Sequence, residues 1–389
     1  MSIKFRGFAG MATVIAAGLS LISCGTSSRT SNILLATSQG ATLIDSFGVN
    51  LNTGVLTQIH TAGQVPSGTS PSAIILDSTG STAYVANVPI SNPTTSPGTI
   101  SAYTVKSDGT LATVGSNVAA GANPIAMTMD PSGKFLFVVN QSSNNVSVYS
   151  IGSPGSLTQV SGSPFATGTA PLPPSNALPA PAGVAVSAGN FVYIANQGQD
   201  TISAFTLNTT TGKLTPVAGS PFAAGTSPSG LGALHTTSNV DVLFSANQGS
   251  NNVSVFNINT DGSLAEVTGS PYSAGLGPVA LIADPTRSFL YVADRTSNQV
   301  SGYKVSPGTG ALTAISPPTA STGTNPVGLA FQPGGNGCTG DACMTNFLYV
   351  VNIGNNTISG FQMTAQSGAL APLAPVATTD AQPSGIAVK

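Results

Sequence analysis

The chain has 389 residues, and only 6% of them are charged, with ten basic side chains against twelve acidic ones. This balance leaves no basic patch for a phosphate backbone, so we expect no nucleic-acid partner. Two histidines and a single glutamate supply little acid–base chemistry, and solubility must come from Ser, Thr, Asn and Gln.

The N-terminus resembles a bacterial lipoprotein signal. Lys4 and Arg6 precede an apolar stretch too short to span a bilayer comfortably, and residues 21–24, Leu-Ile-Ser-Cys, have the form of a lipobox. We therefore expect a signal peptide over 1–23, a lipid on Cys24 and a flexible tether over 24–32. This predicts a lipid-anchored protein of the bacterial cell envelope, at the outer membrane. A plain secretory signal is the alternative and would give a secreted protein.

Seven similar runs recur about every fifty residues along the rest of the chain. They are LLAT (34–37), YVAN (84–87), FVVN (137–140), YIAN (193–196), FSAN (244–247), YVAD (291–294) and YVVN (349–352). Each is followed by a run such as NVSVYSI and then by Gly-x-Leu, and a proline-led run such as PSAIIL precedes all but the first. Turn residues separate the runs, so each unit predicts four short strands: a (proline-led), b (YVAN-like), c (VSVY-like) and d (Gly-x-Leu).

The two chain ends complement each other. The first unit lacks strand a, whereas the last residues, PSGIAVK (383–389), are a strand a with nothing after it. We expect this strand to complete the N-terminal blade and to close the ring without a free sheet edge. The sequence thus predicts an all-β, seven-bladed β-propeller over 33–389 with four-stranded antiparallel blades. A β-solenoid is the alternative, but units of this length are long for it.

Small residues mark the expected centre of the ring. Two positions after every strand-a proline stands Ala73, Ala126, Gly183, Gly230, Ala280, Gly328 or Gly385. The innermost strands of all blades crowd around one axis, and a larger side chain there would push them apart.

The connections between strands lie on two opposite faces of the ring, because successive strands of a blade run in opposite directions. Five aspartates begin a-to-b or c-to-d turns, where a carboxylate accepts backbone hydrogen bonds: Asp77, Asp130, Asp284, Asp108 and Asp261. The opposite face carries the b-to-c and d-to-a connections. Two of these connections contain longer segments, 88–98 and 169–180, and we predict that this is the binding face.

Polar residues at the exit of strand b are the candidate binding residues on that face. They are Asn87, Gln141, Gln197, Gln248 and Arg295. A ring of amide donors and acceptors suits a neutral polar ligand. The asparagines that end strand b have a structural alternative, since Asn at a strand end bonds the backbone of its own turn.

Cysteine and histidine add little chemistry. Cys338 and Cys343 lie close together and predict a local disulfide in an oxidising compartment, with thiol redox chemistry as the alternative. His60 and His235 fall in different blades, so we expect no metal site, and no motif indicates a cofactor.

The YVAN-like runs, with their Gly-x-Leu and proline-led partners, resemble the YVTN-repeat and lactonase-like seven-bladed propellers, the group that contains 6-phosphogluconolactonase. The resemblance implies the propeller fold and a lactonase activity, and histidine after the strand-a proline is typical of that group. Here the residues after those prolines are Ser72, Ile125, Ala182, Ser229, Val279, Val327 and Ser384. None is a general base comparable to histidine.

The sequence leads to two hypotheses about function. The first is a lipid-anchored binding or scaffolding propeller that presents a weakly charged polar face to an envelope protein or a glycan. The second is a lactone hydrolase with a site built from Asp294, Arg295 and Asp200. The scarcity of ionisable residues along the axis favours the first function.

Overall fold

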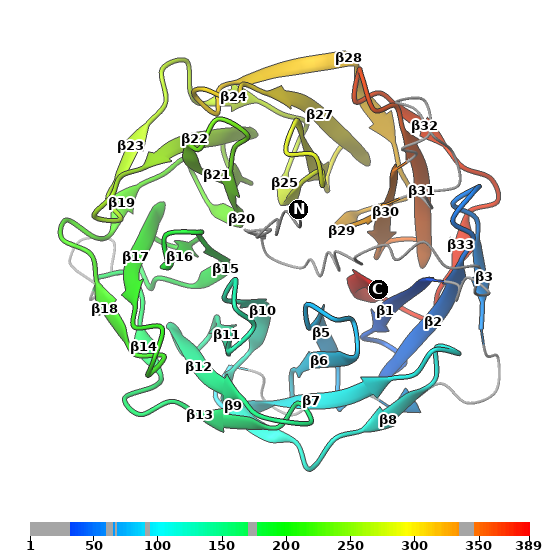
Figure 1. Cartoon of the computed structure of the whole chain (residues 1–389), viewed down its shortest axis with the longest axis horizontal. Coiled ribbons are helices and arrows are strands. Elements are labelled where there is room, and N and C mark those ends of the chain that lie inside the picture. The colour runs from blue at the N-terminus through cyan, green and yellow to red at the C-terminus, as the bar shows by residue number, and fades with distance from the viewer. Residues whose placement is uncertain (1–31, 60–64, 67, 90–93, 170–176, 334–345) are drawn as a thin grey trace, which may run out of the picture.

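Seven antiparallel sheets surround one axis in the computed structural model, which describes residues 32–59, 65–66, 68–89, 94–169, 177–333 and 346–389 (Figure 1). The prediction of an all-β, seven-bladed propeller is confirmed. Every regular element in these ranges is a strand, and none of their residues forms a helix long and apolar enough to cross a membrane. The chain runs once around the ring, and the sheets are its blades.

Each blade is a meander from the axis outward. Strands a are β34 (Pro383–Val388), β5 (Pro71–Leu76), β10 (Pro124–Met129), β15 (Pro181–Val186), β20 (Pro228–His235), β25 (Pro278–Ala283) and β29 (Pro326–Pro333). Strands b are β1 (Asn32–Ser38), β6 (Thr82–Asn87), β11 (Phe135–Asn140), β16 (Phe191–Asn196), β21 (Asp241–Asn247), β26 (Phe289–Asp294) and β30 (Asn346–Asn352). Strands c are β2 (Leu43–Val49), β7 (Pro97–Val105), β12 (Asn145–Ile151), β17 (Thr201–Leu207), β22 (Asn252–Ile258), β27 (Gln299–Val305) and β31 (Thr357–Met363). Blade one contains β34 and β1, and the others are numbered in chain order.

Strand d departs from the expected single strand. Its first parts are β3 (Leu56–Gln58), β8 (Leu111–Thr113), β13 (Leu157–Gln159), β18 (Leu214–Pro216), β23 (Leu264–Glu266) and β32 (Leu370–Pro372). Its second parts, which pair with the start of strand c, are β4 (Val65–Pro66), β9 (Val118–Ala122), β14 (Phe165–Ala166), β19 (Phe222–Ala223), β24 (Tyr272–Ser273) and β33 (Ala377–Thr378). Prolines and positive-φ glycines interrupt the ladder between the two parts in blades three to five. Blade six keeps one strand, β28 (Leu312–Ser321).

The C-terminal strand closes the ring, as predicted. Strand β34 pairs antiparallel with β1, and the register runs from Leu34 opposite Val388 to Ser38 opposite Pro383. The backbone N–H of Lys389 adds a bond of 2.8 Å to the carbonyl of Ile33. Blade one is therefore built from the first and the last described strands, β1 and β34, which lie side by side (Figure 1).

The register of blade one corrects one detail of the repeat alignment. Ser38 pairs with the strand-a proline, as Asn140 does in blade three, so Ser38 and not Thr37 occupies the position of the strand-b asparagine. The Oγ of Ser38 donates to Asp45 of strand c at 2.6 Å. Blades two to five and blade seven have an asparagine on strand b that bonds a serine on strand c. In blade one the hydroxyl is on strand b and the polar partner, Asp45, is on strand c.

The central crowding expected from the small residues is present. A Cβ added at Gly183 would lie 2.1 Å from the carbonyl oxygen of Ser229 in the next blade, and one at Gly230 would lie 2.8 Å from that of Val279. Both contacts are with backbone of a neighbouring strand a. The innermost strands are therefore as close as their main chains allow.

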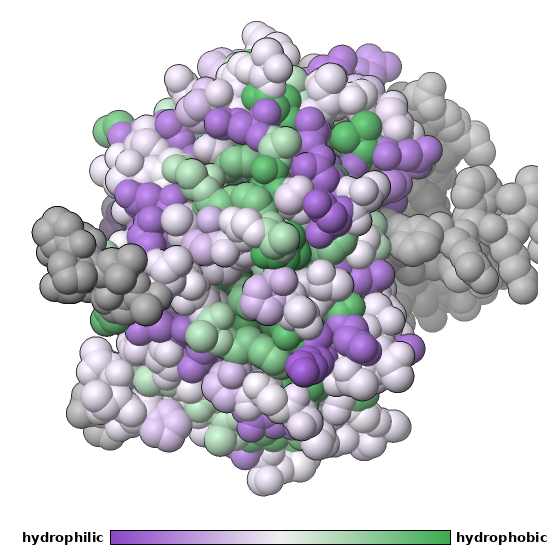
Figure 2. All heavy atoms as spheres, turned by 90° about the vertical axis from the view of Figure 1, so that its left-hand side faces the viewer, coloured by the Kyte–Doolittle hydropathy of each residue, from purple (hydrophilic) through white to green (hydrophobic). Residues whose placement is uncertain are grey.

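The core lies between the blades. Strands b are apolar on both faces because each blade is covered by a neighbour on either side, and all six residues of β11 are buried. The outer surface mixes weakly polar, hydrophobic and hydrophilic patches (Figure 2), as expected where 6% of residues are charged.

Tyrosines of strand b link three pairs of neighbouring blades. The Oη atoms of Tyr193, Tyr291 and Tyr349 donate to the carbonyls of Gly262, Gly368 and Gly54 at 2.9, 2.6 and 2.6 Å. Each glycine lies in the c-to-d turn of the next blade. The hydroxyl of Tyr84 is equally buried but has no hydrogen-bond partner in the structure.

We expect replacement of Tyr193, Tyr291 or Tyr349 by Phe to lower the free energy of unfolding by about 1 kcal/mol each, because each loses a buried hydrogen bond. Tyr84→Phe is the matched control and should leave stability unchanged or raise it, since it removes an unpaired polar atom. Urea unfolding of the four variants measures these differences. Equal losses in all four would contradict the interpretation.

Candidate functional site

The b-to-c and d-to-a connections meet on one face of the ring, which we call the b–c face. The backbone N–H of Gln248 donates to the carbonyl of Ser227 at 3.0 Å, and that of Arg295 donates to Gly277 at 2.9 Å. In both cases a residue just after strand b bonds the residue before a strand-a proline. These bonds hold the rim of the b–c face at the mouth of the axial channel.

The asparagines that end strand b lie under this face and are fully buried. Asn140 and Asn247 each donate from Nδ2 to a strand-c serine, Ser147 or Ser254, at 2.9 Å. Asn87 does the same with Ser101 at 2.9 Å. The structural alternative predicted from sequence holds in part. Asn352 donates to the carbonyl of Thr357 at the end of its own turn at 3.3 Å, while all five asparagines bond a serine of strand c. Asn87 is thus committed to the blade and does not reach the surface.

The three glutamines lie at the rim and are half-buried. Nε2 of Gln197 donates to Oε1 of Gln248 in the next blade at 2.8 Å. Oε1 of Gln141 accepts from Nδ2 of Asn123 at 3.0 Å. The structure therefore brings Gln197 and Gln248 together, as an amide pair that spans two blades.

Arg295 is exposed on the same face. The residue that follows it, Thr296, donates its backbone N–H to the carbonyl of Leu276 at 3.0 Å. Leu276 is itself 55% exposed, which is rare for a large apolar side chain in this protein. The backbone bond places the exposed residues Arg295 and Leu276 in adjoining connections of the b–c face, at blade six.

Asp200 has a structural role in this arrangement. It lies in the b-to-c turn of blade four with φ of 55°, and its Oδ1 accepts the backbone N–H of Ser227 at 2.7 Å. Asparagines take the same place in other blades: Asn251 accepts from Gly277 at 2.8 Å. Asp200 is one member of a repeated contact that joins the b-to-c turns of blades three to seven to the next blade.

Asp294 stands where other blades have the buried strand-b asparagine, and it is 0% exposed. Ser301 donates to its Oδ2 at 2.6 Å, while its Oδ1 has no hydrogen-bond partner in the structure. Burial raises the pKa of Asp294 to about 6. Its carboxylate and Arg295 are adjacent in sequence, but one is enclosed in the blade and the other is open to solvent.

We expect Asp294→Asn to stabilise the protein at pH 7 by up to about 3 kcal/mol. Because the pKa of about 6 in the folded state lies above the ordinary value of 3.8, wild-type stability falls as pH rises from about 4 to 6. The amide carries no charge and restores the donor that other blades have. Urea unfolding of both proteins at pH 4 and pH 7 measures the effect. A stability difference that does not grow with pH would contradict it.

The residue after each strand-a proline lies on the innermost strand of its blade, and we call these seven residues the channel wall. Ser72, Ser229 and Ser384 donate to the carbonyl of the strand-a proline in the next blade: Pro124 at 2.5 Å, Pro278 at 3.1 Å and Pro71 at 2.6 Å. The other four positions are Ile125, Ala182, Val279 and Val327. None of the seven side chains titrates near neutral pH, and all three hydroxyls are engaged with backbone.

His235 lies on the opposite face, at the end of β20. Its Nδ1 is 2.6 Å from Oδ1 of Asp241, and both side chains are 26% exposed. No three His, Cys, Asp or Glu side chains come together as metal ligands in the described part of the chain. His60, Cys24, Cys338 and Cys343 lie outside the described residues.

The fold and the repeats agree with a comparison of the sequence with family models. The model described as lactonase, 7-bladed beta-propeller, matches residues 43–170 and 220–331, which is more than half of the chain. The chain belongs to this lactonase propeller family. No curated protein matches the sequence.

Solved structures agree on the fold of the lactonase propeller family. A Bacteroides fragilis protein provisionally named a 6-phosphogluconolactonase superposes with a TM-score of 0.75 at 19% identity, over 94% of this chain and 99% of that one. The periplasmic gluconolactonase of Pseudomonas aeruginosa gives a TM-score of 0.74 at 21% identity, over 92% and 98%. Such low identities establish a shared fold and leave the chemistry of this chain to its own residues.

Proposed function

We propose that this chain is a binding propeller of the bacterial cell envelope, anchored by a lipid on Cys24, whose b–c face binds a neutral polar partner, a glycan or a protein segment. The observation that carries this proposal is the channel wall. Its seven side chains are aliphatic or are hydroxyls that donate to neighbouring carbonyls. Hydrolysis of a lactone at neutral pH needs a group that activates water, and this wall offers none.

The b–c face has the chemistry of a binding surface. The amide pair Gln197–Gln248 and the exposed Arg295 offer donors and acceptors at the rim, and Leu276 adds an apolar contact. Mixed polar groups next to an exposed large apolar side chain are typical of recognition surfaces. The low net charge of the chain favours an uncharged partner.

Family membership favours a second function, lactone hydrolysis, with Asp294, Arg295 and Asp200 as the candidate groups. Asp294 has a pKa near the range of a general base, but it is 0% exposed and bonded to Ser301. Asp200 accepts a backbone N–H of the next blade. A catalytic role for Asp294 requires blade six to open, and one for the exposed Asp200 would compete with its contact to Ser227, so we place this function second.

Binding can be tested with purified peptidoglycan and with soluble neutral glycans. The triple variant Gln197→Ala, Gln248→Ala, Arg295→Ala removes the polar rim, and Lys213→Ala on the opposite face is the matched control. We expect the triple variant to lose binding in co-sedimentation and calorimetry and the control to keep it. Equal binding by both variants, or none by the wild type, would contradict the proposal.

The lipid anchor is tested separately. Cys24→Ser removes the atom that would carry the lipid, so the variant should leave the membrane fraction, while wild type should stay there and partition into detergent. A wild-type protein that is released without detergent would contradict anchoring and leave the b–c face proposal intact.

A further inference from the structure

Blade six differs from blades three to five in one short segment of strand d. Blades three to five read G-S-P-F (162–165), G-S-P-F (219–222) and G-S-P-Y (269–272), whereas blade six reads P-P-T-A (317–320). The three glycines have φ of 85°, 81° and 90°. Proline cannot adopt such a φ, so Pro317 forces a different path, and β28 runs as one strand where other blades have two.

The segment also lacks a hydrogen bond between strand d and strand c that blades three to five have. Ser163, Ser220 and Ser270 accept the backbone N–H of the central strand-c residue, Val148, Ala204 or Val255, at 2.8, 2.9 and 2.9 Å. In blade six, Pro318 takes the place of the serine and has no hydroxyl, and Gly302 takes the place of the central strand-c residue. The aromatic residue that follows in those blades is Ala320 here.

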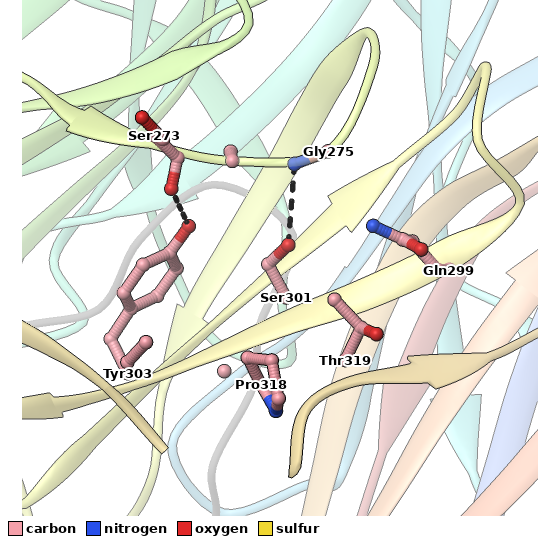
Figure 3. Close-up of a pocket in the computed structure, with 10 residues that line it drawn as sticks. Ser273, Gly275, Gln299, Ser301, Tyr303, Pro318 and Thr319 are labelled. Carbon is pink, nitrogen blue, oxygen red and sulfur yellow. Dashed lines mark hydrogen bonds between the residues drawn. The ribbon is translucent and has the colours of Figure 1, made fainter. Parts of the chain in front are cut away.

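A pocket of about 170 Å³ lies at this place, between blades five and six (Figure 3). Ser273 and Gly275 form one wall, and Ser301, Tyr303 and Thr319 form the other. At about 30 Å³ per water, the volume corresponds to roughly six waters, which is the size of one sugar ring and below that of a drug-sized pocket.

The lining is neutral, mixes polar and apolar groups, and is held in place by hydrogen bonds. Tyr303 donates from Oη to the carbonyl of Ser273 at 2.6 Å, and Gly275 donates its N–H to Oγ of Ser301 at 3.3 Å. Gln299 adds an amide, and Thr319 adds a hydroxyl at an exposed position. Ala314 and Pro318 supply apolar contacts. Donors, acceptors and apolar carbons alternate over a short distance, as the hydroxyls and C–H faces of a sugar require.

The charge near the pocket selects against anions. None of the lining side chains is charged. Behind Ser301 lies the carboxylate of Asp294, 2.6 Å from the serine oxygen. A phosphate or carboxylate in the pocket would meet this buried negative charge in a medium of low dielectric constant, so a neutral ligand is favoured.

We propose that the pocket between blades five and six binds a single neutral sugar ring, through Gln299, Ser301 and Thr319. Ala274 and Gly275 belong to a d-to-a connection, so the pocket lies at the outer edge of the b–c face, on β27 and β28, and it shares no residue with the rim formed by Gln197, Gln248 and Arg295. It therefore adds a second, outer site to the function proposed above and does not depend on the rim. A ligand of this size is expected to bind weakly, in the millimolar range.

The test is saturation-transfer NMR on the full protein with D-glucose, N-acetyl-D-glucosamine and methyl α-D-mannoside, and with glucose 6-phosphate as the anionic comparator. Thr319→Trp fills the pocket from an exposed position, and Thr313→Trp on the same strand is the control, because Thr313 is exposed but does not line it. We expect transfer to at least one neutral sugar, lost in Thr319→Trp and kept in Thr313→Trp. No transfer to any neutral sugar, or unchanged transfer in Thr319→Trp, would overturn the proposal.

The two proposed sites can be told apart. The variant Gln197→Ala, Gln248→Ala alters the rim of the b–c face and leaves every residue of the pocket in place. Transfer that persists in this variant but disappears in Thr319→Trp and weakens in Gln299→Ala supports the pocket. Transfer that follows the glutamines, or that is strongest for glucose 6-phosphate, overturns it.

Discussion

Ending the chain at Gln382, which removes strand β34, is expected to abolish the cooperative thermal unfolding transition of the propeller. Blade one would lose its strand a, and β1 would expose an unpaired edge next to the axis. Ile386, Ala387 and Val388 are buried in the complete ring, and their burial contributes about 5 kcal/mol. This is comparable to the whole stability of a typical domain.

Calorimetry of three samples tests this prediction. The truncated chain should show no transition, and a chain that lacks only Lys389 should show one close to wild type, since it keeps every pair of the β1–β34 register. A synthetic peptide of residues 383–389, added to the truncated chain, should restore a transition. A truncated chain with wild-type Tm would mean that ring closure contributes little.

Gly183→Ala is expected to lower the free energy of unfolding by about 4 kcal/mol or more. The new Cβ would lie 2.1 Å from the carbonyl oxygen of Ser229, well inside van der Waals contact. Because the atom it meets belongs to backbone, no side-chain rotation relieves the clash. Strands β15 and β20 would have to separate, and the innermost ring would open at that point.

Gly328→Ala is the matched control, with the same substitution at the equivalent position of blade seven. There the nearest atoms would be side-chain carbons of Val351 and Ile386, at 3.1 and 3.3 Å, which can shift by small amounts. We expect a change within about 1 kcal/mol. Urea unfolding of the two variants compares them directly, and equal effects would contradict the crowding argument.

The repeat carried most of the fold information in the sequence. Seven YVAN-like runs and an isolated strand a at the C-terminus predict both the blade number and the closure between β34 and β1. The split of strand d was missed because its second part is only two residues long in most blades, too short for a hydrophobic pattern.

The candidate site was harder to predict because its residues bond partners on other strands, either in the next blade or in the same one. Asp200 looks catalytic in isolation, but its partner is Ser227, which belongs to the next blade. The partner of Asp294 is Ser301, seven residues later on strand c. The serine that recurs in VSVY-like runs was the available signal, and only the hairpin register reveals that it faces the strand-b asparagine.

The pocket in blade six also has a signal in the sequence. Blade six has P-P-T-A (317–320) where blades three to five have G-S-P-F or G-S-P-Y. Proline cannot adopt the positive φ that the glycine has in those blades. A deviation from a repeat marks a place where local structure changes. The volume that opens and the side chains that line it depend on the packing of two blades and follow from the coordinates alone.

The most direct test of a non-catalytic propeller is hydrolysis of lactones by the purified protein, followed in a pH-stat with 6-phosphogluconolactone and D-glucono-1,5-lactone. A channel wall without a titrating side chain predicts rates equal to the buffer blank at pH 6 to 8. Turnover above the blank, lost in Asp294→Asn or Arg295→Ala, would contradict the proposed binding function and establish the chain as a lactonase.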